Sequence, residues 1–160
     1  MEQNHRRTIR FKLNGRNAIT EIATHETLLE VLRRDFSLFG GRESCGQGLC
    51  GCCTAIVDGI AVSGCLYLAA FVDGAEVTTV EGLASGDKLH PIQESFIDNC
   101  GFQCGFCTPG FILMTKELLE RHPQPTTDEI RHYLSGNLCR CAAYPDIVRA
   151  VKAAAGEHNR

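Results

Sequence analysis

The stretch from Glu43 to Cys53, ESCGQGLCGCC, decides the chemistry of the first half of the chain. Its cysteines Cys45, Cys50 and Cys53 follow the spacing C-x4-C-x2-C, and Cys65 lies further along the chain. This is the ligand spacing of plant-type 2Fe–2S proteins, which use four thiolates. The intervening glycines let the loop turn tightly and let backbone N–H groups approach the cluster sulfurs. We therefore predict a 2Fe–2S cluster held by Cys45, Cys50, Cys53 and Cys65.

This loop has two alternative interpretations. A structural zinc site also takes four thiolates, but zinc sites typically join two C-x2-C pairs, whereas three candidate ligands here share one loop. The residues Gly46, Gly48 and Gly51 match the dinucleotide-binding fingerprint by letter. That fingerprint requires a strand leading directly into the loop and a helix opening from it, and we predict neither, so we discount the match.

A second set of four cysteines lies in the other half of the chain. Cys104 and Cys107 belong to the motif QCGFCTPG, and Cys139 and Cys141 belong to the motif GNLCRC. Both pairs are expected at helix ends, where backbone N–H groups would stabilise the negative charge of a cluster. A thioredoxin-like redox pair is the alternative, but it needs a βαβ context that this half lacks. We predict a second 2Fe–2S cluster held by Cys104, Cys107, Cys139 and Cys141.

The chain has ten cysteines in 160 residues, which leaves Cys52 and Cys100 outside both sets. We predict that these two are small, partly buried residues and not ligands, because Cys52 adjoins Cys53 and two adjacent residues do not easily reach one cluster. Residues 1–15 contain charges and no apolar run of the length that a secretory signal needs. We therefore expect a cytoplasmic protein, in which disulfides do not persist and many cysteines indicate metal ligation.

The charge balance excludes some classes of partner. Sixteen Lys and Arg residues against 19 Asp and Glu residues give a net charge of −3, which offers no basic footprint for nucleic acid or anionic lipid. Iron that is saturated by sulfur ligands offers one-electron chemistry and no substrate site. We found no catalytic Ser/His/Asp arrangement or carboxylate pair, so the predicted role is electron transfer.

Alternating apolar residues and turn dipeptides predict a sheet in the first half. The dipeptides Asn-Gly at 14–15 and Asp-Gly at 58–59 favour hairpin turns. Thr27 and Glu30 form a capping-box pattern at the start of an apolar-striped segment. The predicted elements are strands at 9–13, 18–22, 54–57, 60–62 and 77–80, the last at an edge, and a helix ending near residue 36.

The second half changes to a helical period. We predict one helix at about 90–99 with Ile92, Phe96 and Ile97 on its buried face, and one that Thr108 caps and that ends before residue 123. Thr126 with Glu129 starts a third helix at 126–136, and a fourth runs from 145 onward. The polar segment 81–88 separates strands from helices. We therefore predict two domains, residues 1–82 and residues 83–160.

Taken together, ESCGQGLCGCC, QCGFCTPG and GNLCRC resemble the small iron–sulfur chain of the xanthine oxidase family of molybdenum hydroxylases. The carbon monoxide dehydrogenase and aromatic-heterocycle dehydrogenase branches are the nearest in form, and the resemblance runs from about residue 9 to residue 151. It implies an α+β chain with an N-terminal β-grasp plant-type ferredoxin domain and a C-terminal four-helix bundle that carries the second cluster.

The resemblance also implies a role and partners. The chain would relay single electrons from a molybdenum-pterin centre on a large subunit through both clusters to FAD on a medium subunit of a heterotrimer, with the substrate site on the molybdenum chain. Gln103 and Cys141 match family positions that face the pterin. Two departures are Cys52 in place of alanine, and Ala142-Ala143 in place of Thr-Gly. The competing functions are a free-standing two-cluster ferredoxin and a zinc-stabilised interaction module.

Overall fold

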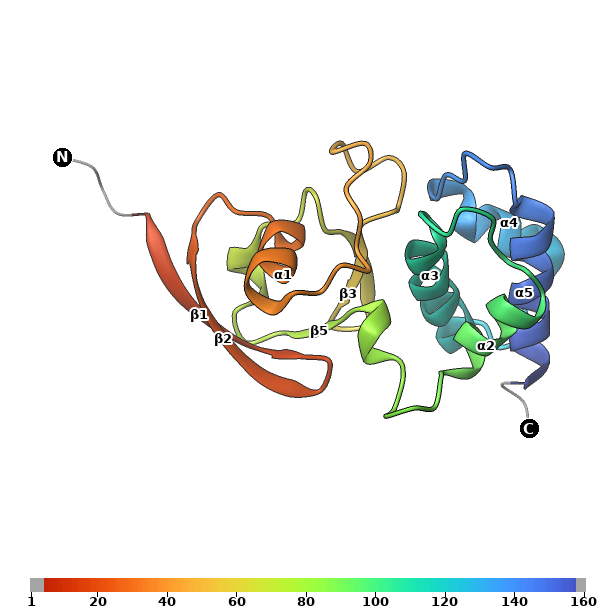
Figure 1. Cartoon of the computed structure of the whole chain (residues 1–160), viewed down its shortest axis with the longest axis horizontal. Coiled ribbons are helices and arrows are strands. Elements are labelled where there is room, and N and C mark those ends of the chain that lie inside the picture. The colour runs from red at the N-terminus through yellow and green to blue at the C-terminus, as the bar shows by residue number, and fades with distance from the viewer. Residues whose placement is uncertain (1–4, 158–160) are drawn as a thin grey trace.

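A computed structural model of the chain describes residues 5–157 and consists of a strand-rich half and a helical half, side by side (Figure 1). Residues 1–4, which begin the stretch in which we expected no secretory signal, lie outside the described part. Each half has its own apolar core. The chain passes between them near residues 80–83, where Val80 and Leu83 contact the helical core. No helix in the described part is long and apolar enough to cross a membrane.

Five strands form one mixed sheet in the order β2-β1-β5-β3-β4. The strands are β1 (Arg6–Leu13), β2 (Arg16–Ala23), β3 (Thr54–Val57), β4 (Ile60–Ser63) and β5 (Glu76–Thr78). Both predicted hairpins form, with Asn14 and Asp58 in the left-handed conformation at φ 51° and 49°.

The prediction that the last strand lies at an edge is wrong. β5 pairs parallel with β1 and antiparallel with β3, so it fills the centre of the sheet. Its central residue Val77 is fully buried. Strand order depends on how the chain returns through the 3-10 turn at Ala69–Val72, and a three-residue strand carries no local sign of having two neighbours.

The helix α1 (Leu28–Phe36) packs its apolar face on the sheet. Its start is fixed by the predicted capping box: the Thr27 side chain accepts from the Glu30 N–H, and the Glu30 carboxylate accepts from the Thr27 N–H at 2.8 Å. Leu28 and Val31 are fully buried together with Ile9 and Ile22. The loop that follows this helix, residues 37–53, lies at the side of the sheet that faces the helical half (Figure 1).

The helical half contains α2 (Pro91–Asp98), α3 (Thr108–Arg121), α4 (Thr127–Tyr133) and α5 (Tyr144–Glu157). Helix α3 packs both on the other helices and on β3 and β4, so it joins the two halves. The predicted cap of α4 forms, because the Thr126 side chain accepts from the Glu129 N–H.

Two predictions in this half are wrong. Ile97 is 52% exposed, whereas Ile92 and Phe96 are buried, because one residue rotates the side chain by about 100° around a helix. Thr108 does not cap α3. Cys107 occupies the cap position, and the Thr108 hydroxyl oxygen is buried without a hydrogen-bond partner.

Candidate metal centres

Glycines and backbone N–H groups shape the first cysteine loop as its sequence predicts. Gly46, Gly48 and Gly51 all have positive φ, between 61° and 71°. These turns bring the N–H groups of Gln47 and Leu49 to 3.4 Å from the Cys45 sulfur. The pKa of Cys45 is lowered to about 6. The hydrogen bond from the Gln47 N–H contributes most, followed by that from the Leu49 N–H and by the Cys50 thiol. The loop thus already stabilises negative charge on sulfur.

The four cysteines of the first set approach one another in pairs. The Cys45 thiol interacts with that of Cys50, and the Cys53 thiol with that of Cys65. Burial, followed by the Cys65 thiol, raises the pKa of Cys53 to about 11 even though the Cys65 N–H opposes this shift. The two pairs are neighbours, because Cys50 also acts electrostatically on Cys53.

The second set forms at helix ends. Cys107 caps α3, and Cys139 follows the 3-10 turn at Leu134–Gly136. The Cys139 sulfur accepts the Ala143 N–H at 3.4 Å, while its own N–H donates to the Tyr144 hydroxyl at 2.9 Å. The expected proximity of cysteines to backbone donors therefore holds at both sites.

This set also consists of pairs. The thiols of Cys107 and Cys139 contact each other, as do those of Cys104 and Cys141. Burial and then Cys139 raise the pKa of Cys107 to about 12. The pKa of Cys104 is lowered, first by the Phe106 N–H and then by the Cys141 thiol. Cys107 and Cys139 are buried and Cys104 is exposed, so the set has an inner and an outer pair.

The paired arrangement fits a two-iron cluster. In residues 5–157, no group of three or more Cys, His, Asp or Glu side chains is arranged to hold a single metal ion. A 2Fe–2S cluster instead takes two thiolates at each iron, which are two adjacent pairs. The N–H groups directed at Cys45 and Cys139 are the donors that such a cluster uses to hold its negative charge.

The two remaining cysteines differ from each other. Cys52 is buried, and its thiol points toward the Cys50 carbonyl at 3.9 Å. Burial, followed by the Cys50 thiol, raises the pKa of Cys52 to about 12, and Cys107 acts on it from the other set. Cys100 is exposed and has φ 52°, so the prediction that it is partly buried is wrong. It follows Asn99, the C-cap residue of α2.

The two cysteine sites are joined by contacts that sequence reasoning did not find. The Leu138 N–H donates to the Cys50 carbonyl at 3.0 Å, and the Asn137 side chain donates to the Gly51 carbonyl at 3.4 Å. Arg42 donates from its side chain to the Gly105 carbonyl at 2.8 Å. Asn137 is 3% exposed, and only its place in the motif GNLCRC could have pointed to this contact between the two sites.

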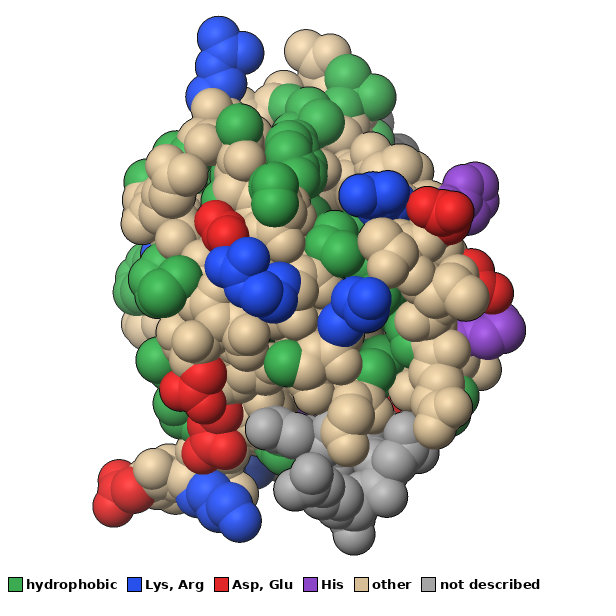
Figure 2. Space-filling model, turned by 90° about the vertical axis from the view of Figure 1, so that its right-hand side faces the viewer, with side chains coloured by type: hydrophobic (Ala, Val, Ile, Leu, Met, Phe, Trp, Pro, Cys, Tyr) green, Lys and Arg blue, Asp and Glu red, His purple; other side chains and the backbone are tan. Residues whose placement is uncertain are grey.

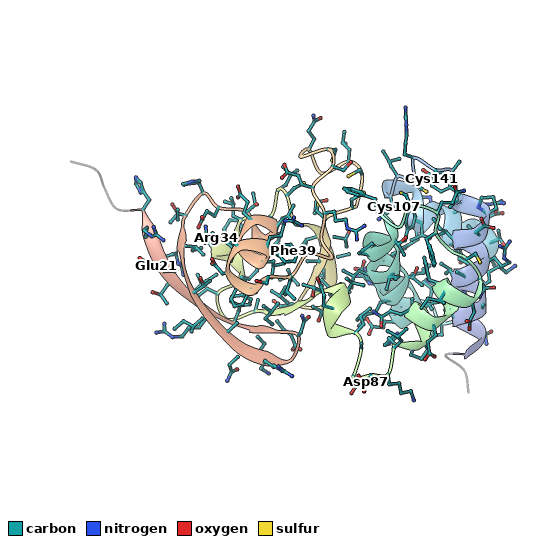
Figure 3. The ribbon with its side chains drawn as sticks, in the orientation of Figure 1. Glu21, Arg34, Phe39, Asp87, Cys107 and Cys141 are labelled. Carbon is teal, nitrogen blue, oxygen red and sulfur yellow. The ribbon has the colours of Figure 1, made fainter. Side chains whose placement is uncertain are left out.

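The surface around the second site is partly apolar. Gln103 is exposed and Cys141 half-buried, and the apolar side chains of Phe102, Leu138 and Tyr144 are exposed beside them. Hydrophobic side chains gather on this end of the molecule in Figure 2, and Figure 3 shows Cys107 and Cys141 close together at one end of the helical half. These cysteines lie far from Glu21, which is at the opposite end of the molecule (Figure 3).

The substituted dipeptide Ala142-Ala143 forms a tight turn. Ala142 has φ 59°, in the left-handed region that L side chains seldom adopt, and Ala143 is buried. The turn is closed by the Ala142 N–H, which donates to the Cys139 carbonyl at 3.2 Å. The departure from Thr-Gly thus leaves an intact turn beside the second set.

Comparison with known proteins gives two matching family models. Residues 11–84 match the 2Fe-2S iron-sulfur cluster binding domain, and residues 79–152 match the 2Fe-2S binding domain. The small subunit of nicotine 6-hydroxylase from Paenarthrobacter nicotinovorans is 47% identical over 93% of this chain and 90% of its own length. The aldehyde oxidoreductase iron-sulfur-binding subunit PaoA of Escherichia coli K12 is 43% identical over 92% of this chain and 71% of its own length.

A solved structure agrees with these relatives. A chain in the crystal structure of quinoline 2-oxidoreductase from Pseudomonas putida 86 has a TM-score of 0.93 with this protein, at 37% identity, and 98% of each chain is covered. The α+β arrangement, the two matching 2Fe–2S domains and the relatives all indicate the same family. The protein belongs to the iron–sulfur subunits of the xanthine oxidase family of molybdenum hydroxylases and is an oxidoreductase component.

Proposed function

We propose that this chain relays single electrons from a molybdenum-pterin centre on a large partner subunit, through two 2Fe–2S clusters, to FAD on a medium partner subunit. One observation carries the proposal: eight cysteines form two sets of paired thiols, one in each half, and the two sets are joined by direct hydrogen bonds. In fold terms, residues 1–82 would be a β-grasp ferredoxin domain and residues 83–160 a four-helix bundle domain.

The ligands follow from the pairs. Cys53 is preferred over Cys52 because its thiol interacts with Cys65, which comes from a different segment, whereas the Cys52 thiol interacts with Cys50 of its own loop and points to the Cys50 carbonyl. When bound, each cluster supplies a one-electron couple, and N–H groups directed at sulfur raise its reduction potential. The proposed ligands are Cys45, Cys50, Cys53 and Cys65 in one set, and Cys104, Cys107, Cys139 and Cys141 in the other.

The backbone offers a short connection between the sets. The Cys50 carbonyl accepts the N–H of Leu138, which directly precedes Cys139, so one hydrogen bond and one intervening residue connect a proposed ligand of each set. The inner pair of the second set, Cys107 and Cys139, is buried. Electrons would therefore pass between the sets inside the protein, shielded from water.

The outer pair supports the direction of flow. Cys104 is exposed beside the exposed Gln103, and exposed apolar side chains surround them. A partner that covers this end would bring its cofactor next to the outer pair, with Gln103 and Cys141 facing the pterin. Electrons would then leave from the first set toward FAD.

The substrate would be bound on the large subunit. The relatives named above are parts of a nicotine hydroxylase and an aldehyde oxidoreductase, so similar small chains occur in enzymes with different substrates. A relay subunit in the cytoplasm that takes electrons only from molybdenum is compatible with either chemistry.

Metal analysis and purification test the proposal. We expect the chain to purify with two larger subunits and to hold about four irons and four acid-labile sulfides, with two distinguishable paramagnetic signals after reduction. A chain that runs alone with both clusters would be a free ferredoxin. Stoichiometric zinc in a colourless protein, or one signal integrating to one spin, would contradict the two-cluster relay.

A further inference from the structure

Arg42 is the one described side chain of the strand-rich half that reaches the C-x2-C loop of the second set through a charged group. Its backbone N–H donates to the Cys52 carbonyl at 2.9 Å, within the first cysteine loop. Its guanidinium donates to the Gly105 carbonyl at 2.8 Å, between Cys104 and Cys107. The same residue therefore holds both cysteine loops, one with its main chain and one with its side chain.

The guanidinium is held in place on a second side. Its central carbon lies 5.4 Å from the centre of the Phe106 ring, so the planar group stacks on an aromatic residue of the loop that it hydrogen-bonds. Gly105 has φ 77°, and the backbone turn there presents its carbonyl to Arg42. Arg42 is half-buried, which reduces the screening of its charge by water.

In the described part of the chain, no carboxylate forms an ion pair with this charge. Among residues 5–157, the ion pairs use other arginines and a lysine, and Arg42 takes part in none of them. Its guanidinium donates to the carbonyl of Gly105, the residue that follows Cys104, so its positive charge lies beside the second set. The cluster of this set would thus have an unpaired cation beside its outer pair.

We propose that Arg42 is a positioning residue that ties the two cluster loops together and raises the reduction potential of the helical-half cluster. This inference rests on the proposed function. A 2Fe–2S cluster with four thiolates carries −2 when oxidised and −3 when it has gained one electron, so a nearby cation stabilises the reduced form more. The helical-half cluster would become a better acceptor from molybdenum.

Arg33 provides a matched control. It donates to the Gly41 carbonyl at 2.9 Å and lies 5.1 Å from the centre of the Phe39 ring, so its contacts have the same chemistry as those of Arg42. Its partners all belong to the strand-rich half, where Figure 3 shows Phe39 away from Cys107 and Cys141. A general loss of packing would affect both arginines, whereas an effect on the second cluster is specific to Arg42.

The test is a redox titration of the assembled complex in which each paramagnetic signal is followed separately. Arg42→Gln should lower the potential of the helical-half cluster by roughly 59 mV, a tenfold change in its reduction equilibrium, and should shift the other cluster less. Arg42→Lys should restore most of this shift because it keeps the charge. Arg33→Gln should leave both potentials unchanged.

The outcomes separate the possible failures. Equal potentials in Arg42→Gln and the natural protein, equal shifts in both clusters, or no recovery in Arg42→Lys would each overturn the inference. Arg42→Met, which keeps an apolar stem over Phe106, replaces Arg42→Gln if that variant takes up too little iron. If the proposed function itself is wrong, the natural protein will lack a second signal to titrate, which differs from two signals that do not move.

Discussion

The two cysteine sites of this protein build similar ligand sets from different local structures. In the strand-rich half, three cysteines share a loop whose path depends on glycines with positive φ. In the helical half, the four cysteines come from two short segments. One lies at the start of α3, and the other lies between the 3-10 turn at Leu134–Gly136 and α5. The first site is thus encoded almost entirely by a continuous stretch, whereas the second exists only once the helices pack.

The sites also differ in how their thiols are exposed. Each pair of the first set combines a buried and a half-buried cysteine, whereas the second set has a buried inner pair and a more exposed outer pair. A site whose two pairs are equally exposed offers a partner no preferred side for electron transfer. A site with an exposed outer pair and a buried inner pair offers its outer pair to a partner. In the proposed relay, the helical-half site would receive electrons at the surface and pass them inward.

Removing one proposed ligand from each site should give the largest effects on electron transfer, and the two sites should respond differently. In Cys107→Ala, we expect loss of about two irons and no reduction of the first-set cluster by substrate, because its only donor is gone. In Cys50→Ala, substrate should still reduce the helical-half cluster, but reduction of FAD should be very slow. Rapid-mixing spectroscopy of the assembled complex distinguishes the two results.

The order of the sites is wrong if Cys50→Ala prevents reduction of the helical-half cluster while Cys107→Ala still passes electrons to flavin at a normal rate. Folding must be checked in both variants, because each cluster would also stabilise its half.

Adding a single methyl group where α3 contacts the first cysteine loop should lower the stability of the protein. A Cβ at Gly110 in α3 would overlap the Gly51 carbonyl oxygen, which is backbone and cannot rotate away. Gly110→Ala should therefore lower the free energy of unfolding by about 1–3 kcal/mol and slow electron transfer between the clusters. Thermal unfolding and rapid mixing measure these two quantities.

Gly156→Ala is the matched control for that variant. Gly156 also lies in a helix, α5, but nothing is within 4 Å of an added Cβ. This change should be neutral or stabilising by about 0.5–1 kcal/mol. Similar losses in the two variants would show that contact between the halves does not explain the result.

The smallest expected effect concerns the extra cysteine between the sites. Cys52→Ala should keep all the iron, because its thiol points to the Cys50 carbonyl, and should cost about 1 kcal/mol of stability for the lost buried sulfur. Cys100→Ala, at an exposed position, should change neither quantity. Iron content and unfolding temperature are the measurements. Loss of two irons from Cys52→Ala would mean that Cys52, not Cys53, is the ligand.

Much of the fold could be predicted because its signals are local. The hairpin dipeptides at 14–15 and 58–59 and the capping boxes at Thr27 and Thr126 each act over a few residues, and each forms as predicted. The errors occurred where distant segments decide. The central position of β5 depends on two strands far along the chain, and the exposure of Ile97 depends on which side of α2 meets α5.

The sequence by itself determined the first cysteine loop, because spacing within a short loop is fixed by chain geometry, and it determined the order of strands followed by helices. The eight ligand assignments stay predictions. Only the tertiary structure decided that the Cys53 thiol meets that of Cys65, that Cys107 meets Cys139 and that Cys104 meets Cys141. It also decided that the Leu138 N–H reaches Cys50, Asn137 reaches Gly51 and Arg42 reaches Gly105. The physical reason is that these contacts join segments separated by long stretches of chain. Their formation depends on the packing of α3 against β3 and β4, which no local pattern records.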